Sequence, residues 1–300
     1  MKKKLIITGA SGFLGYHLLR AASADWEVYG ITNSKSFVRK DSYGDFKDAV
    51  AINCNIRNYI ELGNFIDDIE PDAIIHAAAI SDANFCEQNK DLSYEVNVEA
   101  TKNLAGICCD FHIPFAFTST DLVFDGAQGM YKEDAQKNPL SIYGEQKSIA
   151  EDEVLRIYPE ASVFRLPLMF GIPEASVSNY LQKFISQLKN GEKTSLFFDE
   201  YRSICGARSI AEGILKLMNE TGITHLAGKE RLSRYEFGVK AANSFQINES
   251  LLLSCSQKDV KMAAPRPADV SLDISKAVSL RFAPLSVDEE LKLIADKKYF

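Results

Sequence analysis

The first half of this 300-residue chain alternates short apolar runs with segments of helical periodicity. Apolar runs rich in β-branched residues are typical of buried strands, and apolar residues recurring every three or four positions indicate helices. Strands separated by helices form βαβ units, so the pattern predicts an α/β fold with a Rossmann-type, doubly wound parallel sheet. The predicted strands are Lys4–Thr8, Glu27–Thr32, Ala49–Asn53, Ala73–His76, Pro114–Thr118 and Ala161–Leu166, and the predicted helices are Phe13–Ala22, Tyr59–Asp68, Leu92–Phe111 and Ile142–Ile157.

The alternation becomes less regular beyond Pro167, which indicates a smaller, interleaved C-terminal lobe. Further helices are predicted at Tyr180–Lys189, Ile210–Asn219, Arg234–Ala242 (with an N-cap at Ser233) and Val287–Lys297, and an extended segment at Ala264–Ala268. We predict that residues 1–166, with about 204–225 returning, form the Rossmann domain. Residues 167–203 and 226–300 would form the substrate-binding lobe, so that the substrate lies between the two.

The composition excludes several classes of protein. Hydrophobic residues at 46% and charged residues at 25% are typical of an ordinary globular protein, and a net charge of −7 argues against a nucleic-acid partner. No apolar run approaches the length of a membrane span. The six cysteines do not have the spacing of metal ligands, so no metal site is expected. We therefore expect a cytoplasmic enzyme.

Three glycines at the first strand-to-helix turn, in the sequence T-G-A-S-G-F-L-G from Thr8 to Gly15, indicate a dinucleotide site. Glycine lets the backbone approach a diphosphate, and the N-terminus of the next helix offers free N–H groups and positive potential. The spacing G-x-x-G-x-x-G differs from that of the common dinucleotide fingerprint. A tight turn without a ligand is the alternative interpretation.

The end of the second strand indicates which dinucleotide binds. An acidic residue there is usual in NAD-binding proteins, whereas basic residues suit the 2′-phosphate of NADP. No carboxylate lies between Glu27 and Asp41, and Lys35 and Arg39 follow the strand. NADP(H) is therefore favoured, with NAD(H) possible. Alternatively, these two basic residues are solvated loop charges.

Tyr143 and Lys147, four residues apart at the start of a predicted helix, form a candidate proton-transfer pair. They share a helix face, and we expect the lysine charge to lower the tyrosine pKa so that the phenol can exchange a proton with a carbonyl. Thr120 ends the fifth strand, at the edge where ligands of parallel sheets bind, and can donate to the same carbonyl. The spacing alone is also common on surface helices, and hydroxyls are common in plain turns.

These motifs together resemble those of the extended short-chain dehydrogenases/reductases, and most closely the dTDP-4-dehydrorhamnose reductase family. The resemblance is carried by the glycine turn, by His76-Ala-Ala-Ala79, by Asn97 in a Val-Asn-Val context and by Tyr143-x-x-x-Lys147. The segment from Ser119 to Gly126 is close to that family's S-T-D-Y-V-F-D-G, and two C-terminal segments, Gly228–Phe237 and Arg266–Asp273, are similar to its motifs.

The resemblance implies a catalytic triad of Thr120, Tyr143 and Lys147, in which Tyr143 gives its proton to a keto oxygen and Lys147 binds the cofactor ribose. Residues expected at the cofactor are Gly9, Ser11, Gly12, Phe13, Leu14, Gly15, Asn33, Ser34, Lys35, Asn55, Ile56, Ala77, Ala78, Ala79, Asn97, Tyr143 and Lys147. Residues expected at the substrate are Ser81, Thr120, Asp121 and Arg266. An arginine between two prolines can equally brace the lobe, and His76 is expected to be structural.

The sequence thus predicts an NADPH-preferring reductase of a nucleotide-linked 4-keto-6-deoxy sugar, with a homodimer as one option for its assembly. One alternative is a sugar-nucleotide epimerase or dehydratase that keeps NAD tightly bound. Another is a non-catalytic regulatory subunit similar to the β subunit of methionine adenosyltransferase, which resembles the same family.

Overall fold

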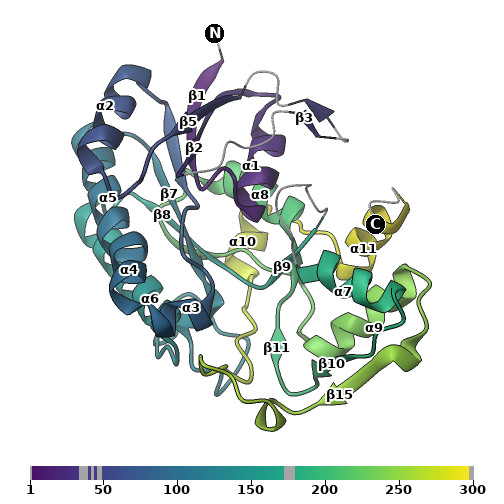
Figure 1. Cartoon of the computed structure of the whole chain (residues 1–300). Helices are drawn as coiled ribbons and strands as arrows, with labels where there is room; N and C mark the ends of the chain where they lie inside the picture. Colours follow the sequence, from purple (N-terminus) through teal and green to yellow (C-terminus); the bar gives the residue numbers. More distant parts are fainter. Residues whose placement is uncertain (1, 34–39, 42–43, 46–48, 172–179, 297–300) are drawn as a thin grey trace.

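The computed structural model describes residues 2–33, 40–41, 44–45, 49–171 and 180–296. Seven of the strands in these residues form one parallel sheet at the centre of the molecule (Figure 1), in the order β13-β8-β7-β6-β1-β2-β5. Their bounds are β1 (Lys3–Thr8), β2 (Trp26–Thr32), β5 (Val50–Asn53), β6 (Ala73–His76), β7 (Phe115–Thr120), β8 (Ser162–Leu166) and β13 (Gly222–His225). The order runs outwards in both directions from β1 and β6, which is the predicted doubly wound topology.

Helices cover both faces of this sheet, as Figure 1 shows. Those on one face share a core with Leu5 and Ile7 of β1, and those on the other share a core with Ile6 between them, because successive strand residues point to opposite faces. The first group is α1 (Phe13–Ala22) and α8 (Ala207–Leu217), and the second is α2 (Tyr59–Ile69), α5 (Ala100–Asp110) and α6 (Ile142–Ile157). None of the helices in the described ranges is long and apolar enough to cross a membrane.

The predicted helix Leu92–Phe111 is interrupted in the structure. It consists of α4 (Lys90–Tyr94), a π-helical turn η1 (Glu95–Glu99) and α5. The wide turn contains Asn97, whose fully buried side chain bonds to a neighbouring loop instead of pointing to solvent. A short helix, α3 (Ala83–Gln88), precedes it and was not predicted; the Asp82 side chain caps it.

The lobe has its own apolar core, which includes Phe184, Leu196 and Phe237. Its small sheets pair β10 with β15, β11 with β14 and β12 with β9. The elements are β9 (Met169–Phe170), α7 (Tyr180–Lys189), β10 (Thr194–Phe197), β11 (Tyr201–Arg202), β12 (Cys205–Gly206), β14 (Leu232–Ser233), α9 (Arg234–Ser244), β15 (Leu252–Cys255), α10 (Ser275–Ser279) and α11 (Val287–Asp296). The predicted N-cap at Ser233 is confirmed as a capping box with Glu236. Short 3₁₀ turns η2 (Asp121–Val123), η3 (Glu249–Leu251) and η4 (Gln257–Asp259), and the hairpin β3 (Lys40–Asp41) with β4 (Gly44–Asp45), complete the described elements.

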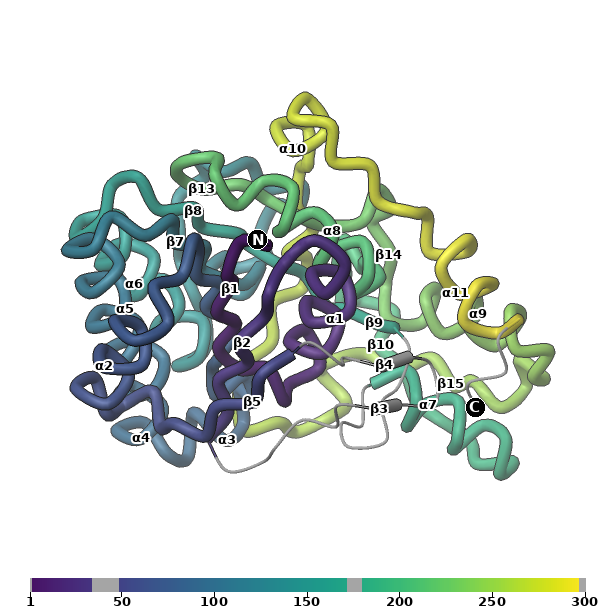
Figure 2. The backbone as a smooth tube through the Cα atoms, turned by 90° about the horizontal axis from the view of Figure 1, so that it is seen from above, coloured from purple at the N-terminus to yellow at the C-terminus, as the bar shows by residue number. Residues whose placement is uncertain are grey.

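The chain enters the lobe twice, and its path can be followed by the colours in Figure 2. After β8 it forms the elements from β9 to β12, returns through α8 to add β13 beside β8, and then forms the remaining lobe elements. We did not predict β13 as a strand, because its four residues carry little apolar pattern. The domain boundaries at 166 and about 204–225 stay a prediction.

Candidate functional site

The glycine turn between β1 and α1 leaves no room for side chains. Gly9 has a φ of +69°, and a Cβ atom on it would lie 2.7 Å from the Ala78 nitrogen. A Cβ atom on Gly15 would overlap the Gly9 carbonyl oxygen. Gly12 is the N-cap of α1, no side chain caps the helix, and its first turn contains no acidic residue. This arrangement fits a diphosphate, because backbone N–H groups and a positive helix end stay accessible where side chains are missing.

The segment Ala77–Ala79 follows β6 and lies against the glycine turn. The Thr8 hydroxyl accepts from the Ala78 amide at 3.2 Å and contacts His76 Nδ1 at 2.7 Å, while His76 Nε2 lies 2.9 Å from the Thr101 hydroxyl. Burial lowers the pKa of His76 to about 3, with a further contribution from the Lys147 charge. A neutral, fully bonded imidazole holds the two strand ends together, which agrees with a structural His76.

Asn97 holds the same segment from the other side. Its Oδ1 accepts from the Ile80 amide at 2.9 Å, and its Nδ2 donates to the Ile80 carbonyl at 3.0 Å and to Gln146 Oε1 at 2.9 Å. The side chain is fully buried. Its amide is therefore bonded to the loop after β6 and to α6. The direct contact with a cofactor stays a prediction.

The predicted adenosine side is described only in part. Ser34 and Lys35, like Arg39, lie outside the described residues. Asn33 is exposed at the end of β2, and Ile56 is buried. Asn55 is half-buried and its Oδ1 accepts from the Arg57 amide at 3.1 Å. The assignment of these residues to the cofactor stays a prediction.

Thr120, Tyr143 and Lys147 come together where β7 ends and α6 begins. The Ser141 hydroxyl caps α6 by accepting from the Gly144 amide at 3.2 Å, and Glu87 of α3 accepts from the Ile142 amide at 2.9 Å. Tyr143 therefore occupies the first turn of α6 and Lys147 the next turn of the same face. The three side chains are 7%, 8% and 2% exposed, so charges on them are weakly screened by solvent.

We expected Lys147 to lower the pKa of Tyr143, but the structure raises this pKa. Burial raises the pKa of the Tyr143 phenol, the Asp121 and Cys86 charges raise it further, and a hydrogen bond with Thr120 opposes them. Lys147 Nζ lies 3.9 Å from the centre of the Phe117 ring, and burial lowers the pKa of Lys147 to about 7. A lysine directed at an aromatic ring and only partly protonated does not offset the burial of the phenol. Tyr143 is consequently protonated at neutral pH, the form that can donate a proton.

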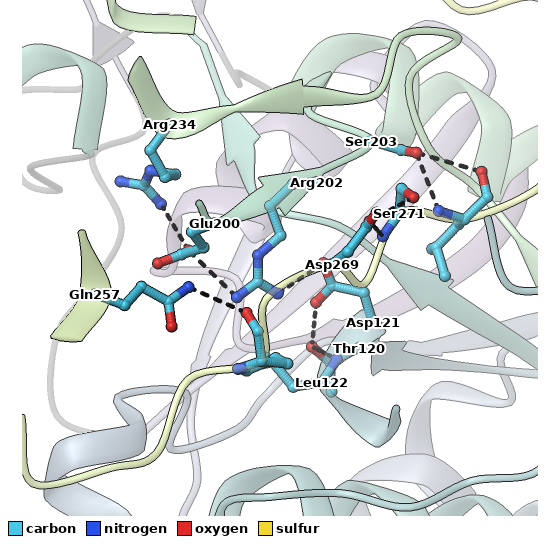
Figure 3. Close-up of polar contacts among 12 residues, drawn as sticks. Thr120, Asp121, Leu122, Glu200, Arg202, Ser203, Arg234, Gln257, Asp269 and Ser271 are labelled. Carbon is cyan, nitrogen blue, oxygen red and sulfur yellow. Dashed lines mark hydrogen bonds and ion pairs between the residues drawn. The ribbon is translucent and has the colours of Figure 1, made fainter. Parts of the chain in front are cut away.

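Asp121 forms a buried contact that the sequence did not predict, with Arg202 of β11. Arg202 Nη1 donates to Asp121 Oδ2 at 3.1 Å, and Nη2 donates to Glu200 Oε1 at 3.3 Å (Figure 3). Arg234 Nη1 lies 3.8 Å from the same Glu200 oxygen. Arg202 is 81 positions from Asp121, so no local spacing could reveal the pair. The signal in the sequence was the group of charged residues Asp199, Glu200 and Arg202 in a mainly apolar part of the lobe.

The other two predicted substrate residues lie at the surface of the same region. Ser81 is exposed directly before the Asp82 cap of α3. Arg266 is half-buried, and its Nε donates to Met262 Sδ at 3.0 Å. Within the described part of the chain, neither of them bonds to Thr120, Tyr143 or Lys147.

The loop that carries Arg266 packs against the segments that follow β6 and β7. The Ala264 amide donates to Asn84 Oδ1 at 3.0 Å, which places the loop on α3. The Asp269 amide donates to the Gly126 carbonyl at 3.2 Å, which joins the loop to the segment after Asp121. Two of the segments that carry the family resemblance, Ser119–Gly126 and Arg266–Asp273, are thus in contact.

Comparison with known proteins identifies one family over the whole chain. The family model described as "RmlD substrate binding domain" matches residues 3–299. Methionine adenosyltransferase 2 subunit beta of Xenopus tropicalis is 30% identical over 285 residues, 91% of this chain and 81% of that protein. A probable low-salt glycan biosynthesis reductase of Haloferax volcanii is 28% identical over 275 residues, 90% of this chain and 89% of that protein.

Solved structures agree in fold. A hypothetical dTDP-4-dehydrorhamnose reductase from Sulfolobus tokodaii has a TM-score of 0.81 and 31% identity, and the match covers 96% of this chain and 98% of that one. A dTDP-4-dehydrorhamnose reductase from Bacillus anthracis, solved in complex with NADP, has a TM-score of 0.86 and 23% identity over 99% of this chain and 100% of that one. At 23% identity, the similarity to the Bacillus anthracis structure shows the fold alone.

Proposed function

The chain belongs to the RmlD substrate binding domain family of extended short-chain dehydrogenases/reductases and is an NAD(P)H-dependent oxidoreductase, and we propose that it reduces a nucleotide-linked 4-keto-6-deoxy sugar with a preference for NADPH. Its motifs predicted this family. The relatives include reductases and a subunit of another enzyme, so the substrate and the cofactor preference rest on the site itself.

The observation that carries the proposal is the enclosed group of Thr120, Tyr143 and Lys147 beside a turn shaped for a diphosphate. A neutral phenol and a hydroxyl stand together at the carboxyl end of a parallel strand, where ligands of this sheet type bind. The segment Ala77–Ala79 follows β6, which is the neighbour of β7, and the glycine turn follows β1, the next strand along the same edge. Gly9–Gly15 would hold the diphosphate of a dinucleotide along this edge, and Tyr143 would lie on the side of its nicotinamide.

Each residue of the triad has a distinct part in the reduction. The cofactor, when bound, supplies the hydride that adds to the carbonyl carbon. The Tyr143 hydroxyl gives its proton to the carbonyl oxygen, so that the ketone becomes a secondary alcohol and a phenolate is left. The Thr120 hydroxyl donates a hydrogen bond to the same oxygen and fixes its direction. Lys147 would bind a ribose hydroxyl, and in its protonated form its charge would compensate part of the cost of the buried phenolate.

The substrate-binding assignments support a sugar nucleotide in particular. Asp121 can accept hydrogen bonds from sugar hydroxyls, Ser81 can donate to one, and the Arg266 guanidinium suits a phosphate because it has no carboxylate partner among the described residues. These three residues come from the loops after β6 and β7 and from the lobe. A ligand that touches all three spans the two parts of the molecule.

The proposal is tested by a screen of NADPH oxidation. The purified protein is mixed with NADPH and a panel of nucleotide-linked 4-keto-6-deoxy sugars, with the corresponding 4-hydroxy sugars as controls. We expect stoichiometric oxidation with at least one keto sugar and none with the hydroxy sugars. No oxidation across the panel, by protein that binds NADPH, would contradict the proposal.

A regulatory subunit is the second candidate, because one of the most similar relatives is a methionine adenosyltransferase subunit at 30% identity. The complete triad favours catalysis over this role. Co-purification of a second enzyme, together with a negative keto-sugar screen, would reverse the ranking.

An epimerase or dehydratase is a third possibility within the same fold. A dehydratase needs an acid/base carboxylate free to move a proton, whereas Asp121, the carboxylate beside Thr120, is held by Arg202. Purified protein that carries one equivalent of non-exchanging NAD would favour this alternative.

A further inference from the structure

Asp121 connects the catalytic strand to the substrate lobe through opposite oxygens of one carboxylate. The Thr120 hydroxyl donates to Oδ1 at 3.2 Å, and Arg202 Nη1 donates to Oδ2 at 3.1 Å (Figure 3). Arg202 is fixed in turn by Glu200 through its other terminal nitrogen. The ion pair between η2, directly after β7, and β11 is thus linked to the Thr120 hydroxyl, which we propose to bond to the reacting carbonyl.

The surroundings make this contact electrostatically important. Asp121 is 2% exposed and Arg202 4% exposed, so each charge depends on the other for stabilisation. Burial raises the pKa of the Asp121 carboxyl, Arg202 and the Thr120 hydrogen bond lower it, and Glu200 raises it. Among the residues that the structure describes, Tyr143 of α6 also faces Asp121, and Arg234 of α9 compensates Glu200.

We propose that Arg202 is a positioning residue of the reduction, which acts from the substrate lobe through Asp121 to hold the Thr120 hydroxyl beside Tyr143. An ionised carboxylate only accepts hydrogen bonds, so without substrate it accepts the single Thr120 proton and fixes the position of the hydroxyl oxygen. When a carbonyl binds, that proton turns from Asp121 to the carbonyl oxygen. A protonated carboxyl can donate to Thr120 instead and releases it from that orientation. Arg202 favours the ionised form. The inference rests on the proposed reductase activity.

A direct contact between Arg202 and the substrate is the competing explanation. The Arg202 Nε atom is buried and has no partner among the described residues, so it could in principle bind a ligand oxygen. The two roles differ in their kinetics. Loss of a ligand contact raises KM, whereas loss of positioning lowers kcat and makes it depend on the titration of Asp121.

The test uses charge-changing variants of the pair, with full pH profiles of kcat. Arg202→Gln keeps a donor and removes the charge; we expect kcat to fall about 10- to 100-fold, as for a misplaced hydrogen-bond donor. The decrease of kcat at low pH, which we call the acid limb of the profile, should move up by about 1–3 pH units. An arginine neighbour lowers the pKa of an aspartate by this amount. Arg202→Lys should restore the limb, and Arg202→Gln combined with Asp121→Asn should abolish it.

A second variant shifts the limb in the opposite direction. Glu200→Gln removes the carboxylate that raises the Asp121 pKa, so its acid limb should move to lower pH. A purely structural role of the pair would not give opposite shifts in two variants of similar stability. Glu200→Gln also keeps the inference testable if Arg202→Gln does not fold.

One measurement needs no substrate. The infrared C=O stretch of a protonated carboxyl should persist to higher pH in Arg202→Gln than in the wild type, and this additional band should be missing from the double variant. Its absence from Arg202→Gln would overturn the inference without touching the proposed function. Unshifted acid limbs in both Arg202→Gln and Glu200→Gln, or a loss confined to KM, would overturn it as well.

Discussion

A side chain on Gly144 would overlap the carbonyl oxygen of Leu122, so α6 approaches the end of β7 more closely than any other residue at this position allows. Gly144 follows Tyr143, and Leu122 donates its amide to the Thr120 hydroxyl at 3.2 Å. This backbone contact therefore sets the separation between the hydroxyls of Thr120 and Tyr143, the two that we propose to act in the reduction.

Gly144→Ala should separate these hydroxyls. We expect a loss of about 1–3 kcal/mol in the free energy of unfolding from the overlap. A shift of roughly 1 Å at a catalytic group should lower kcat about 100-fold. Urea unfolding and steady-state kinetics measure the two effects.

Gly106→Ala is the matched control, because a Cβ atom on this helical glycine of α5 would meet nothing within 4 Å. It should stabilise the protein by about 0.5–1 kcal/mol, the usual gain of alanine over glycine in a helix, and leave kcat unchanged. Equal behaviour of the two variants would show that the Gly144 contact does not position Tyr143.

Gly9→Ala should abolish dinucleotide binding. A Cβ atom there lies 2.7 Å from the Ala78 nitrogen, so the two strand ends that we assign to the cofactor must move apart. Gly191→Ala has a similar φ of +76° but nothing within 4 Å, so it carries only the backbone strain of about 1 kcal/mol. Fluorescence titration with NADPH should separate the two variants. Equal affinities would remove the glycine turn from the cofactor site.

Tyr143→Phe should lower kcat by about 10²–10⁴-fold, the usual contribution of a positioned proton donor, while the Kd for NADPH stays near that of the wild type. The exposed Tyr59→Phe serves as the control. Near-normal turnover by Tyr143→Phe would eliminate the phenol as the acid.

Lys147 should make stability depend on pH. Its folded pKa, about 7, lies below its ordinary 10.5, so the unfolded chain holds more protons between these values and stability from this group rises with pH across the window. Lys147→Met should exceed the wild type in free energy of unfolding at pH 7 by several kcal/mol, at about 1.4 per pKa unit, and this advantage should shrink toward pH 10. Urea titrations at both pH values measure it. A constant difference would mean that the buried lysine keeps its ordinary pKa.

We expect the cofactor preference to depend on the residues after β2. Because no carboxylate stands between Glu27 and Asp41, kcat/KM should favour NADPH over NADH by about tenfold or more, as expected for one charge-assisted hydrogen bond. Lys35→Glu should reverse the order, and the exposed Lys193→Glu should not. A native preference for NADH would contradict our interpretation of this strand end.

Local patterns predicted most of the fold but not the contacts between distant segments. The bounds of α1, α6 and α7 follow from 3.6-residue periodicity and caps, and the triad is assembled because strand ends and helix starts meet at one edge of a parallel sheet. Two features of the candidate site escaped prediction. The pairing of Asp121 with Arg202 depends on tertiary structure, and the raised pKa of Tyr143 depends on burial, which the spacing to Lys147 does not report.

The late return of the chain to form β13 has a consequence for biosynthesis. When a ribosome has released residues 1–166, β8 is an edge strand with unpaired backbone groups, and its partner follows only after more than fifty further residues. Exposed strand edges invite pairing with other chains. The nascent nucleotide-binding half should therefore need protection until residue 225 emerges, and a fragment cut at 166 should aggregate where the full chain does not.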